Sequence, residues 1–175
     1  MISSICFNCN TAILTNAEYN HSVEHVSDSL YRFAVHFLKD SEEARDVVQD
    51  AFEKLWLNRE KVEREKVKSW LFTCVHNAML NQVSRKKMQI THLDSLGKSD
   101  FQQPDLAFES KQVVDLMVES LPPLQKSILL LRDLEGYTYD EIGDMLSISS
   151  AQVKVYLFRA RIKLKKQLKG IFVLA

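Results

Sequence analysis

The chain has 175 residues, its 23 Lys and Arg are balanced by 23 Asp and Glu, and 46% of its residues are hydrophobic. It holds only 4 Gly and 3 Pro, and its apolar residues recur at helical spacing, which predicts an all-α fold of two small helical domains joined by a flexible linker. No apolar run approaches the roughly 20 residues that cross a bilayer, and the N-terminus lacks the basic start of a signal peptide, so we expect a cytoplasmic protein without membrane insertion.

Residues 1–20 are expected to form an N-terminal extension. Cys6 and Cys9 form a CxxC pair, and His21 and His25 lie one helical turn apart, so the two pairs could in principle complete a four-ligand zinc site. A CxxC without a strand–helix redox context is more often incidental. We therefore predict no metal and no cofactor, and three cysteines at uneven spacing fit a reduced, cytosolic protein.

The first domain is predicted over residues 21–87 and begins with two helices. A stripe of apolar residues defines the core face of the second of these, which Ser41 is expected to cap. The stripe consists of Ala44, Val47, Val48, Ala51, Phe52 and Leu55. The rest of that helix is acidic, with six acids and three bases from Lys39 to Leu57. An acidic face repels DNA but can bind a basic or amide-rich protein surface, although a solvated face is the simpler interpretation of this segment alone.

A charged connection at residues 58–66 leads to a third helix at residues 67–87. Its inward positions are predicted to be Val67, Trp70, Leu71, Cys74, Val75 and Ala78. Asn77, Asn81, Ser84 and Arg85 share the other side, and from Val67 to His92 there are four Lys or Arg and no acid. Amides and hydroxyls suit base edges, and basic residues suit phosphates. Trp70 could stack on an unpaired base, though a Trp on an apolar stripe is more often part of the core.

Residues 88–110 are predicted to be the linker, because helical periodicity is lost there. Its 23 residues could extend about 75–80 Å, whereas DNA advances about 34–36 Å per turn. The two domains could therefore reach separate sites on one duplex. An ordinary interdomain tether is the simpler alternative.

The second domain, residues 111–170, carries the pattern of a helix-turn-helix. Thr138 and Glu141 form a T-x-x-E capping box, and Ser149 and Gln152 form a second one after a short turn. An apolar stripe follows along the last helix. It consists of Val153, Leu157, Ala160, Leu164 and Leu168.

The opposite face of this last helix is basic. Between Ala151 and Lys169 there are seven Lys or Arg and no acid, whereas five acids and no base occur from Asp133 to Asp144. The start of a recognition helix carries base-reading side chains, and phosphate contacts lie further along. The base-reading candidates are Ser150, Gln152, Lys154, Val155 and Tyr156, and the phosphate candidates are Arg159, Arg161 and Lys163. The alternative, a solvated helical hairpin, does not account for the one-sided charge and the two capping boxes.

These segments resemble a known family. LPPLQKSILLLRDLEGYTYDEIGDMLSISSAQVKVYLFRARIKLKKQL is similar to region 4 of bacterial RNA polymerase sigma factors. EEARDVVQDAFEKLW, followed by VKSWLFTCVHNAMLNQVSRKK, is similar to region 2. Only these two regions occur, in this order, over about residues 21–169, which resembles the extracytoplasmic-function (ECF) group. Gly143 stands where relatives usually have Ala, which is expected to weaken its helix slightly.

The resemblance implies a role for each surface. Asp46, Gln49 and Asp50 would dock on the β′ clamp helices of core RNA polymerase. The −10 promoter element would be captured by the connection at residues 58–66 and the third helix, and the −35 element would be read by the last helix. The implied −10 contacts are Trp70, Asn77, Asn81, Ser84, Arg85 and Lys86. The implied −35 contacts are Ser150, Ala151, Gln152, Lys154, Val155, Tyr156, Arg159 and Arg161.

The sequence thus predicts a non-enzymatic specificity subunit that binds core polymerase and promoter DNA. Many members of the group are held inactive by an anti-sigma factor, so such a partner is expected here. The main alternative is a stand-alone helix-turn-helix regulator with a helical sensing domain, which would not need an acidic docking helix. An enzyme with a DNA-binding tail is not supported, because the sequence shows no nucleophile–base pair, metal cluster or phosphate loop.

Overall fold

The computed structural model describes residues 14–94 and 110–173, which form seven α-helices and two short helical turns. The first unit contains α1 (Asn16–Leu38), α2 (Ser41–Leu57), the 3₁₀ turn η1 (Arg64–Lys66) and α3 (Val67–Asp94). The second contains α4 (Ser110–Glu119), α5 (Pro123–Leu129), the π-helical turn η2 (Leu130–Leu134), α6 (Tyr139–Leu146) and α7 (Ser150–Val173). No strand occurs in these ranges, which confirms the all-α prediction, and none of their helices could cross a membrane.

The N-terminal extension is shorter than predicted, because α1 starts upstream of His21. Thr15 caps this helix in a capping box with Glu18: the Glu18 N–H donates to Thr15 Oγ1, and the Thr15 N–H donates to Glu18 Oε2. Leu14 is buried and Tyr19 packs edge-on against the ring of α2's Trp56, at 5.0 Å between centroids. The T-x-x-E pattern in the sequence is the signal that could have placed this boundary.

A tight turn joins α1 to α2. Lys39 ends α1 in the left-handed conformation at φ 58°, and its N–H donates to the Val35 carbonyl. Asp40, rather than the predicted Ser41, is the N-cap of α2, since its carboxylate accepts the N–H groups of Glu42 and Glu43. These backbone hydrogen bonds lower the pKa of Asp40 below its ordinary value.

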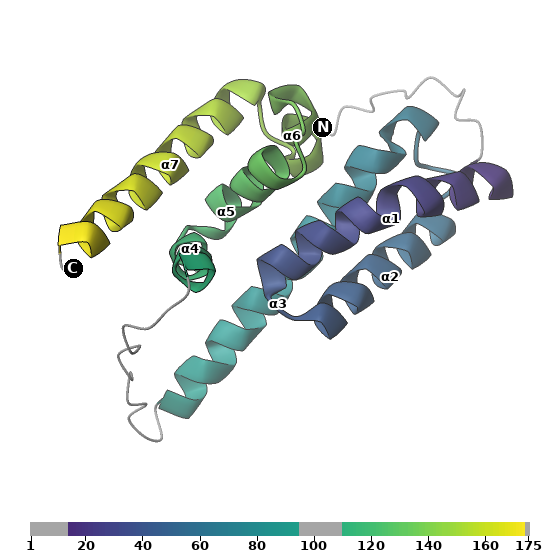
Figure 1. Ribbon diagram of the computed structural model, residues 1–175. Coiled ribbons are helices and arrows are strands. Elements are labelled where there is room, and N and C mark those ends of the chain that lie inside the picture. The colour runs from purple at the N-terminus through teal and green to yellow at the C-terminus, as the bar shows by residue number, and fades with distance from the viewer. Residues whose placement is uncertain (1–13, 95–109, 174–175) are drawn as a thin grey trace, which may run out of the picture.

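Helix α3 lies at the centre of the molecule, against α1 and α2 on one side and α6 on the other (Figure 1). Phe72 is fully buried and contacts the ring of Phe33 on α1 at 5.8 Å and that of Tyr137, just before α6, at 5.3 Å. Because α3 is covered from two sides, Phe72 and Met79 are buried outside the single inward stripe that the sequence predicted. The two units thereby share one hydrophobic core.

The predicted linker starts too early. Helix α3 continues to Asp94, seven residues beyond its predicted end at Lys87, because no Gly or Pro interrupts the chain there before Gly97. Helix α4 begins at Ser110, the last residue of the predicted linker. The remainder, residues 95–109, lies outside the described residues, as do Cys6 and Cys9.

Between α5 and α6 the chain widens into a π-helical turn before it reverses. The Glu135 N–H donates to the Leu130 carbonyl five residues back, at 3.2 Å. Gly136 follows at φ 79°, a left-handed conformation that Gly adopts readily at the end of a helix. This reversal brings Tyr137 onto Phe72 and starts α6 against α3.

Candidate nucleic-acid interface

The helix-turn-helix forms as predicted, with both capping boxes closed. The Glu141 N–H donates to Thr138 Oγ1 at 3.3 Å, and Thr138 N–H donates to Glu141 Oε2 at 2.9 Å. In the second box, Gln152 N–H donates to Ser149 Oγ at 3.2 Å and Ser149 N–H donates to Gln152 Oε1 at 2.9 Å. The carboxamide oxygen of Gln152 is therefore engaged at the helix start, so a further hydrogen bond from this side chain would come from its NH₂ group.

The turn between α6 and α7 requires a glycine at position 143. A Cβ there would lie 2.7 Å from the Ile148 carbonyl oxygen and 3.5 Å from the Ser150 nitrogen, both backbone atoms. Gly143 was expected only to weaken α6 slightly. Its main role is to let the backbone of the turn approach the helix closely, because it has no Cβ.

We predict that Gly143→Ala lowers stability. The alanine would contribute roughly 1 kcal/mol of helix propensity, but forcing a methyl group into close-packed backbone typically costs about 1–3 kcal/mol. The net loss should be up to about 2 kcal/mol in the free energy of unfolding, measured by urea titration. Asp144→Ala, at an exposed neighbouring position, is the control. A Gly143→Ala protein as stable as wild type would show that the turn yields at no cost.

The predicted −35 residues share the outer surface of α7. Ser150 and Tyr156 are half-buried, and the others are exposed. The exposed members are Ala151, Gln152, Lys154, Val155, Arg159 and Arg161. Arg161 pairs with Asp133 on η2 at 2.6 Å, and Lys163 donates to the Ser120 carbonyl, so both side chains already have partners within the protein.

Two exposed apolar residues on this surface were not predicted from the sequence. Phe158 is 65% exposed and Ile162 is 51% exposed, and with Val155 they form an uncovered apolar stripe at i, i+3 and i+7. The spacing that predicted the buried stripe of α7 also places these three on its outer side, so the signal was present. Apolar side chains on a recognition helix suit the methyl group of thymine.

Three of the predicted −10 residues gather around one hollow between α2 and α3. Asn77, Asn81 and Arg85 line this space of about 330 Å³ together with Asp50 of the predicted polymerase-docking set. Gln82 lines it as well, and its carboxamide oxygen is buried without a hydrogen-bond partner. The hollow is therefore lined by polar groups that could form hydrogen bonds with a ligand.

The other predicted −10 residues lie elsewhere. Trp70 is half-buried and lines a separate hollow of about 340 Å³ with Asn58, Val62 and Lys66 of the connection before α3. Ser84 is exposed on α3. Lys86 forms an ion pair with Glu43 on α2 at 2.6 Å, which ties it to its own domain.

Along α2, the predicted docking residues face solvent. Asp46, Gln49 and Asp50 are all exposed, while the neighbouring Val47, Val48 and Ala51 are buried in the core. The described residues contain no cluster of three or more His, Cys, Asp or Glu that could hold a metal ion.

Comparison with known proteins identifies both units. The family model for sigma-70 region 2 matches residues 23–88, and that for sigma-70 region 4 matches residues 111–164. The ECF RNA polymerase sigma factor SigM of Bacillus subtilis is 33% identical over 142 residues, which cover 79% of this chain and 87% of SigM. The chain belongs to the ECF sigma factors. The resemblance found in the sequence is thereby confirmed.

Another sigma factor and two solved structures are also similar. The sigma factor YlaC of B. subtilis is 28% identical over 159 residues, covering 86% of this chain and 89% of YlaC. The sigma factor RpoE of Bartonella quintana, solved with the anti-sigma factor NepR, superposes with a TM-score of 0.68 at 22% identity, covering 87% of this chain and 97% of RpoE. CnrH, solved with the cytosolic domain of CnrY, gives 0.65 at 19%, covering 89% and 90%. Sigma factors are non-enzymatic initiation factors that direct promoter-dependent transcription.

Proposed function

We propose that this ECF sigma factor engages core RNA polymerase through α2, holds the separated −10 strand at α3, and reads the −35 duplex with α7. The observation that carries the proposal is the separation of charge: an exposed acidic face on α2, a basic face on α7, and an amide-lined hollow at α3. Each surface suits a different partner, since acid repels phosphate and amides suit base edges.

The two DNA-facing surfaces differ as a melted and a paired element require. The hollow with Asn77, Asn81 and Arg85 offers donors and acceptors to a base that has left its pair. Trp70, beside the connection at residues 58–66, offers a ring for stacking. On α7, Lys154 and Gln152 lie at the end of the helix that enters a major groove, so they are placed to contact base edges. A stand-alone regulator would use α7 alone.

An anti-sigma factor is also part of the proposal. RpoE of B. quintana was solved with the anti-sigma factor NepR, and this chain has an open apolar hollow of about 440 Å³ in its second unit. Leucines and valines dominate its lining, which would fit the apolar face of an amphipathic helix. The apolar lining residues are Val114, Val118, Leu129, Leu130, Leu134, Leu164 and Leu168.

The test of the proposed function is reconstitution. The purified full chain is added to core RNA polymerase from B. subtilis with a promoter library that is randomised across the −35 and −10 elements. Enrichment of two separated motifs in the transcribed pool supports the proposal. Tight binding of the chain to duplex without polymerase, and no transcript with it, would favour the stand-alone regulator.

One prediction separates the two arginines of α7. Arg159 is exposed and forms no salt bridge within the described residues, whereas Arg161 would have to leave Asp133 to reach a phosphate. Arg159→Ala should weaken promoter binding of the reconstituted polymerase roughly tenfold and lower the slope of log K against log salt by about one. Arg161→Ala should have less than half that effect on log K. Equal losses would mean that the Asp133 pair does not compete with DNA.

A further inference from the structure

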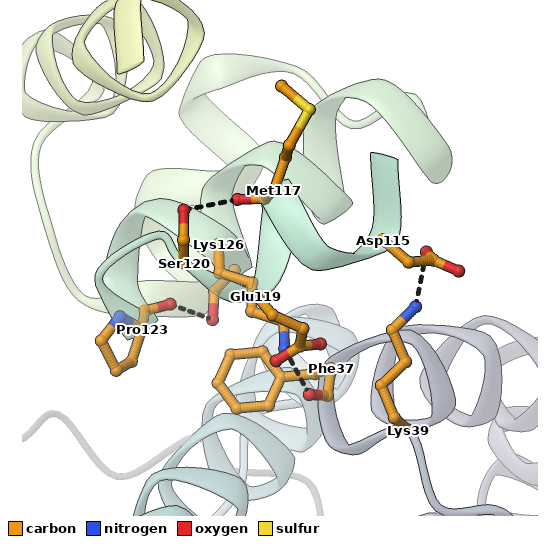
Figure 2. A network of polar contacts seen from close by, with 9 residues as sticks. Phe37, Lys39, Asp115, Met117, Glu119, Ser120, Pro123 and Lys126 are labelled. Atoms are coloured by element: carbon orange, nitrogen blue, oxygen red, sulfur yellow. Dashed lines mark hydrogen bonds and ion pairs between the residues drawn. The ribbon is translucent and has the colours of Figure 1, made fainter. Parts of the chain in front are cut away.

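The two units meet along a seam at which α1 and α3 face the second unit. Helix α1 ends there, and its last carbonyl groups have no partner within the helix. Lys126 of α5 reaches across and donates from Nζ to the Phe37 carbonyl at 2.6 Å (Figure 2). The same ammonium group donates to Glu119 Oε1 at 2.6 Å and lies 4.7 Å from the centre of the Phe37 ring. A cation is thus held at the negative end of the α1 dipole.

Lys126 is buried, with only 4% of its surface exposed. Burial lowers the pKa of its ammonium, and the nearby Glu119 carboxylate partly offsets this. A buried lysine needs such partners, because an unpaired ammonium in the interior is strongly disfavoured. Since the Phe37 carbonyl belongs to the other unit, Lys126 is fully satisfied only when the two units are together.

Other polar contacts run along the same seam. Lys39, at the end of α1, pairs with Asp115 on α4 at 2.7 Å (Figure 2). Here the first unit supplies the cation, whereas in the Lys126 contact the second unit does. Arg32 on α1 pairs with Glu135 after η2 at 2.8 Å. On α3, Thr73 Oγ1 donates to the Met145 carbonyl at 2.7 Å. These contacts fix the two units in one relative position.

That position is too compact for the two promoter elements. Elements at −10 and −35 are about 25 base pairs apart, or roughly 85 Å of straight duplex. From the Thr73–Met145 contact, Asn81 lies about 12 Å further along α3. Lys154 is nine residues from Met145, so even an extended chain would place it within about 31 Å. With the width of the contact itself, the two reading surfaces lie at most roughly 50 Å apart, and side chains cannot bridge the difference.

We propose that Lys126 latches the two units into a closed form of the free protein, and that this latch must open before both promoter elements can be contacted. The inference rests on the proposed function for the location of the two DNA-reading surfaces. Closure acts through spacing rather than by covering them, because Asp50, Asn81 and Lys154 are all exposed in the closed form. Core polymerase can therefore dock on α2 first, and opening follows.

Lys126→Met tests the latch in the full chain, because it removes the ammonium but keeps a long apolar side chain. Small-angle X-ray scattering of the free protein should show a radius of gyration larger by roughly 3–8 Å than that of wild type. Lys169→Met, at an exposed position on α7, is the matched charge-loss control and should remain compact. An unchanged radius for Lys126→Met, with circular dichroism that confirms its helices, would overturn the proposal.

A charge-reversal pair provides a second test that leaves Lys126 and its direct partners in place. Lys39→Glu places a second carboxylate opposite Asp115 and should expand the protein, whereas Lys39→Glu combined with Asp115→Lys should restore the compact radius. If the double variant stays expanded, the Lys39–Asp115 ion pair does not help to hold the closed form together.

Affinity of the reconstituted polymerase for promoter DNA distinguishes this inference from the proposed function. When the form that can contact both promoter elements is rarely populated, the apparent Kd equals the intrinsic Kd divided by that population. Polymerase carrying Lys126→Met should therefore bind a promoter with both elements about tenfold more tightly than polymerase carrying the wild-type chain, as the loss of a charged hydrogen bond implies. Equal affinity and equal radius would refute the latch but leave the proposed function standing. No binding by either protein, with an expanded variant, would refute the proposed function alone.

Discussion

Gln49→Ala combined with Asp50→Ala should abolish association with core RNA polymerase. Both side chains are exposed on the acidic face of α2, and residues that anchor an interface each contribute about 2 kcal/mol or more, so the double change should weaken binding at least about a hundredfold. Co-purification with core polymerase and a titration of fluorescently labelled chain measure the effect. The melting temperature should stay within about 2 °C of wild type, because surface substitutions seldom alter stability by more than about 0.5 kcal/mol.

The control removes acidic charge from other positions of the same helix. Glu42→Ala combined with Glu53→Ala removes two exposed acids of α2, one more than the test variant, and leaves Gln49 and Asp50 in place. It should bind core polymerase within a few-fold of wild type. If the control loses binding as completely as the test variant, α2 acts only as a diffuse negative surface. If the test variant binds normally, docking on this face is wrong.

Stability should fall steeply as the pH drops from 6.5 toward 4, and His76 should account for much of the loss. This side chain on α3 is 6% exposed, its Nε2 has no hydrogen-bond partner, and burial lowers its pKa from 6.5 to about 4. The folded state therefore keeps His76 neutral while the unfolded chain takes up a proton below pH 6.5. The stability that neutral His76 preserves is fully present above pH 6.5 and is lost down to about pH 4, a change of roughly 3 kcal/mol.

Urea titrations at several pH values between 4 and 7 measure this loss. His76→Leu removes the titrating group and should flatten the curve over that interval by most of the expected change. His36→Leu, a second histidine on α1 and only half-buried, controls for the loss of a histidine as such. An acid-sensitive His76→Leu protein with the wild-type slope would assign the loss to other groups.

The elements of the fold could largely be predicted, because periodicity and caps act locally. Both capping boxes around the turn of the helix-turn-helix were visible as T-x-x-E and S-x-x-Q, and both close in the structure. Thr15 and Glu18 form the same T-x-x-E pattern, which marks the true start of α1 upstream of the predicted one. Family membership also followed from the sequence, since the region 2 and region 4 patterns are long and occur in order.

Contacts between distant segments could not be predicted. Lys126 reads as a surface residue of a short helix, because its burial depends on a carbonyl 89 residues away. Phe72 and Met79 were missed for a related reason: a single helix pattern does not reveal that a second unit covers the other side. At the candidate site, sequence patterns located Asn77 and Asn81 on one face of α3, but only the structure places Asp50 beside them.

The seam between the two units has a further consequence for the chemistry of its side chains. A surface that is buried in the closed form and exposed to water in the open form must be stable in both environments. Tyr137 combines an apolar ring with a hydroxyl group, and Thr73 combines a methyl group with a hydroxyl group. Lys68 has a long hydrocarbon stem, and its ammonium lies 4.2 Å from the centre of the Tyr137 ring. Opening would still uncover the apolar ring of Phe72, which Tyr137 covers, so these mixed side chains reduce the hydrophobic surface that an opened molecule exposes without removing it.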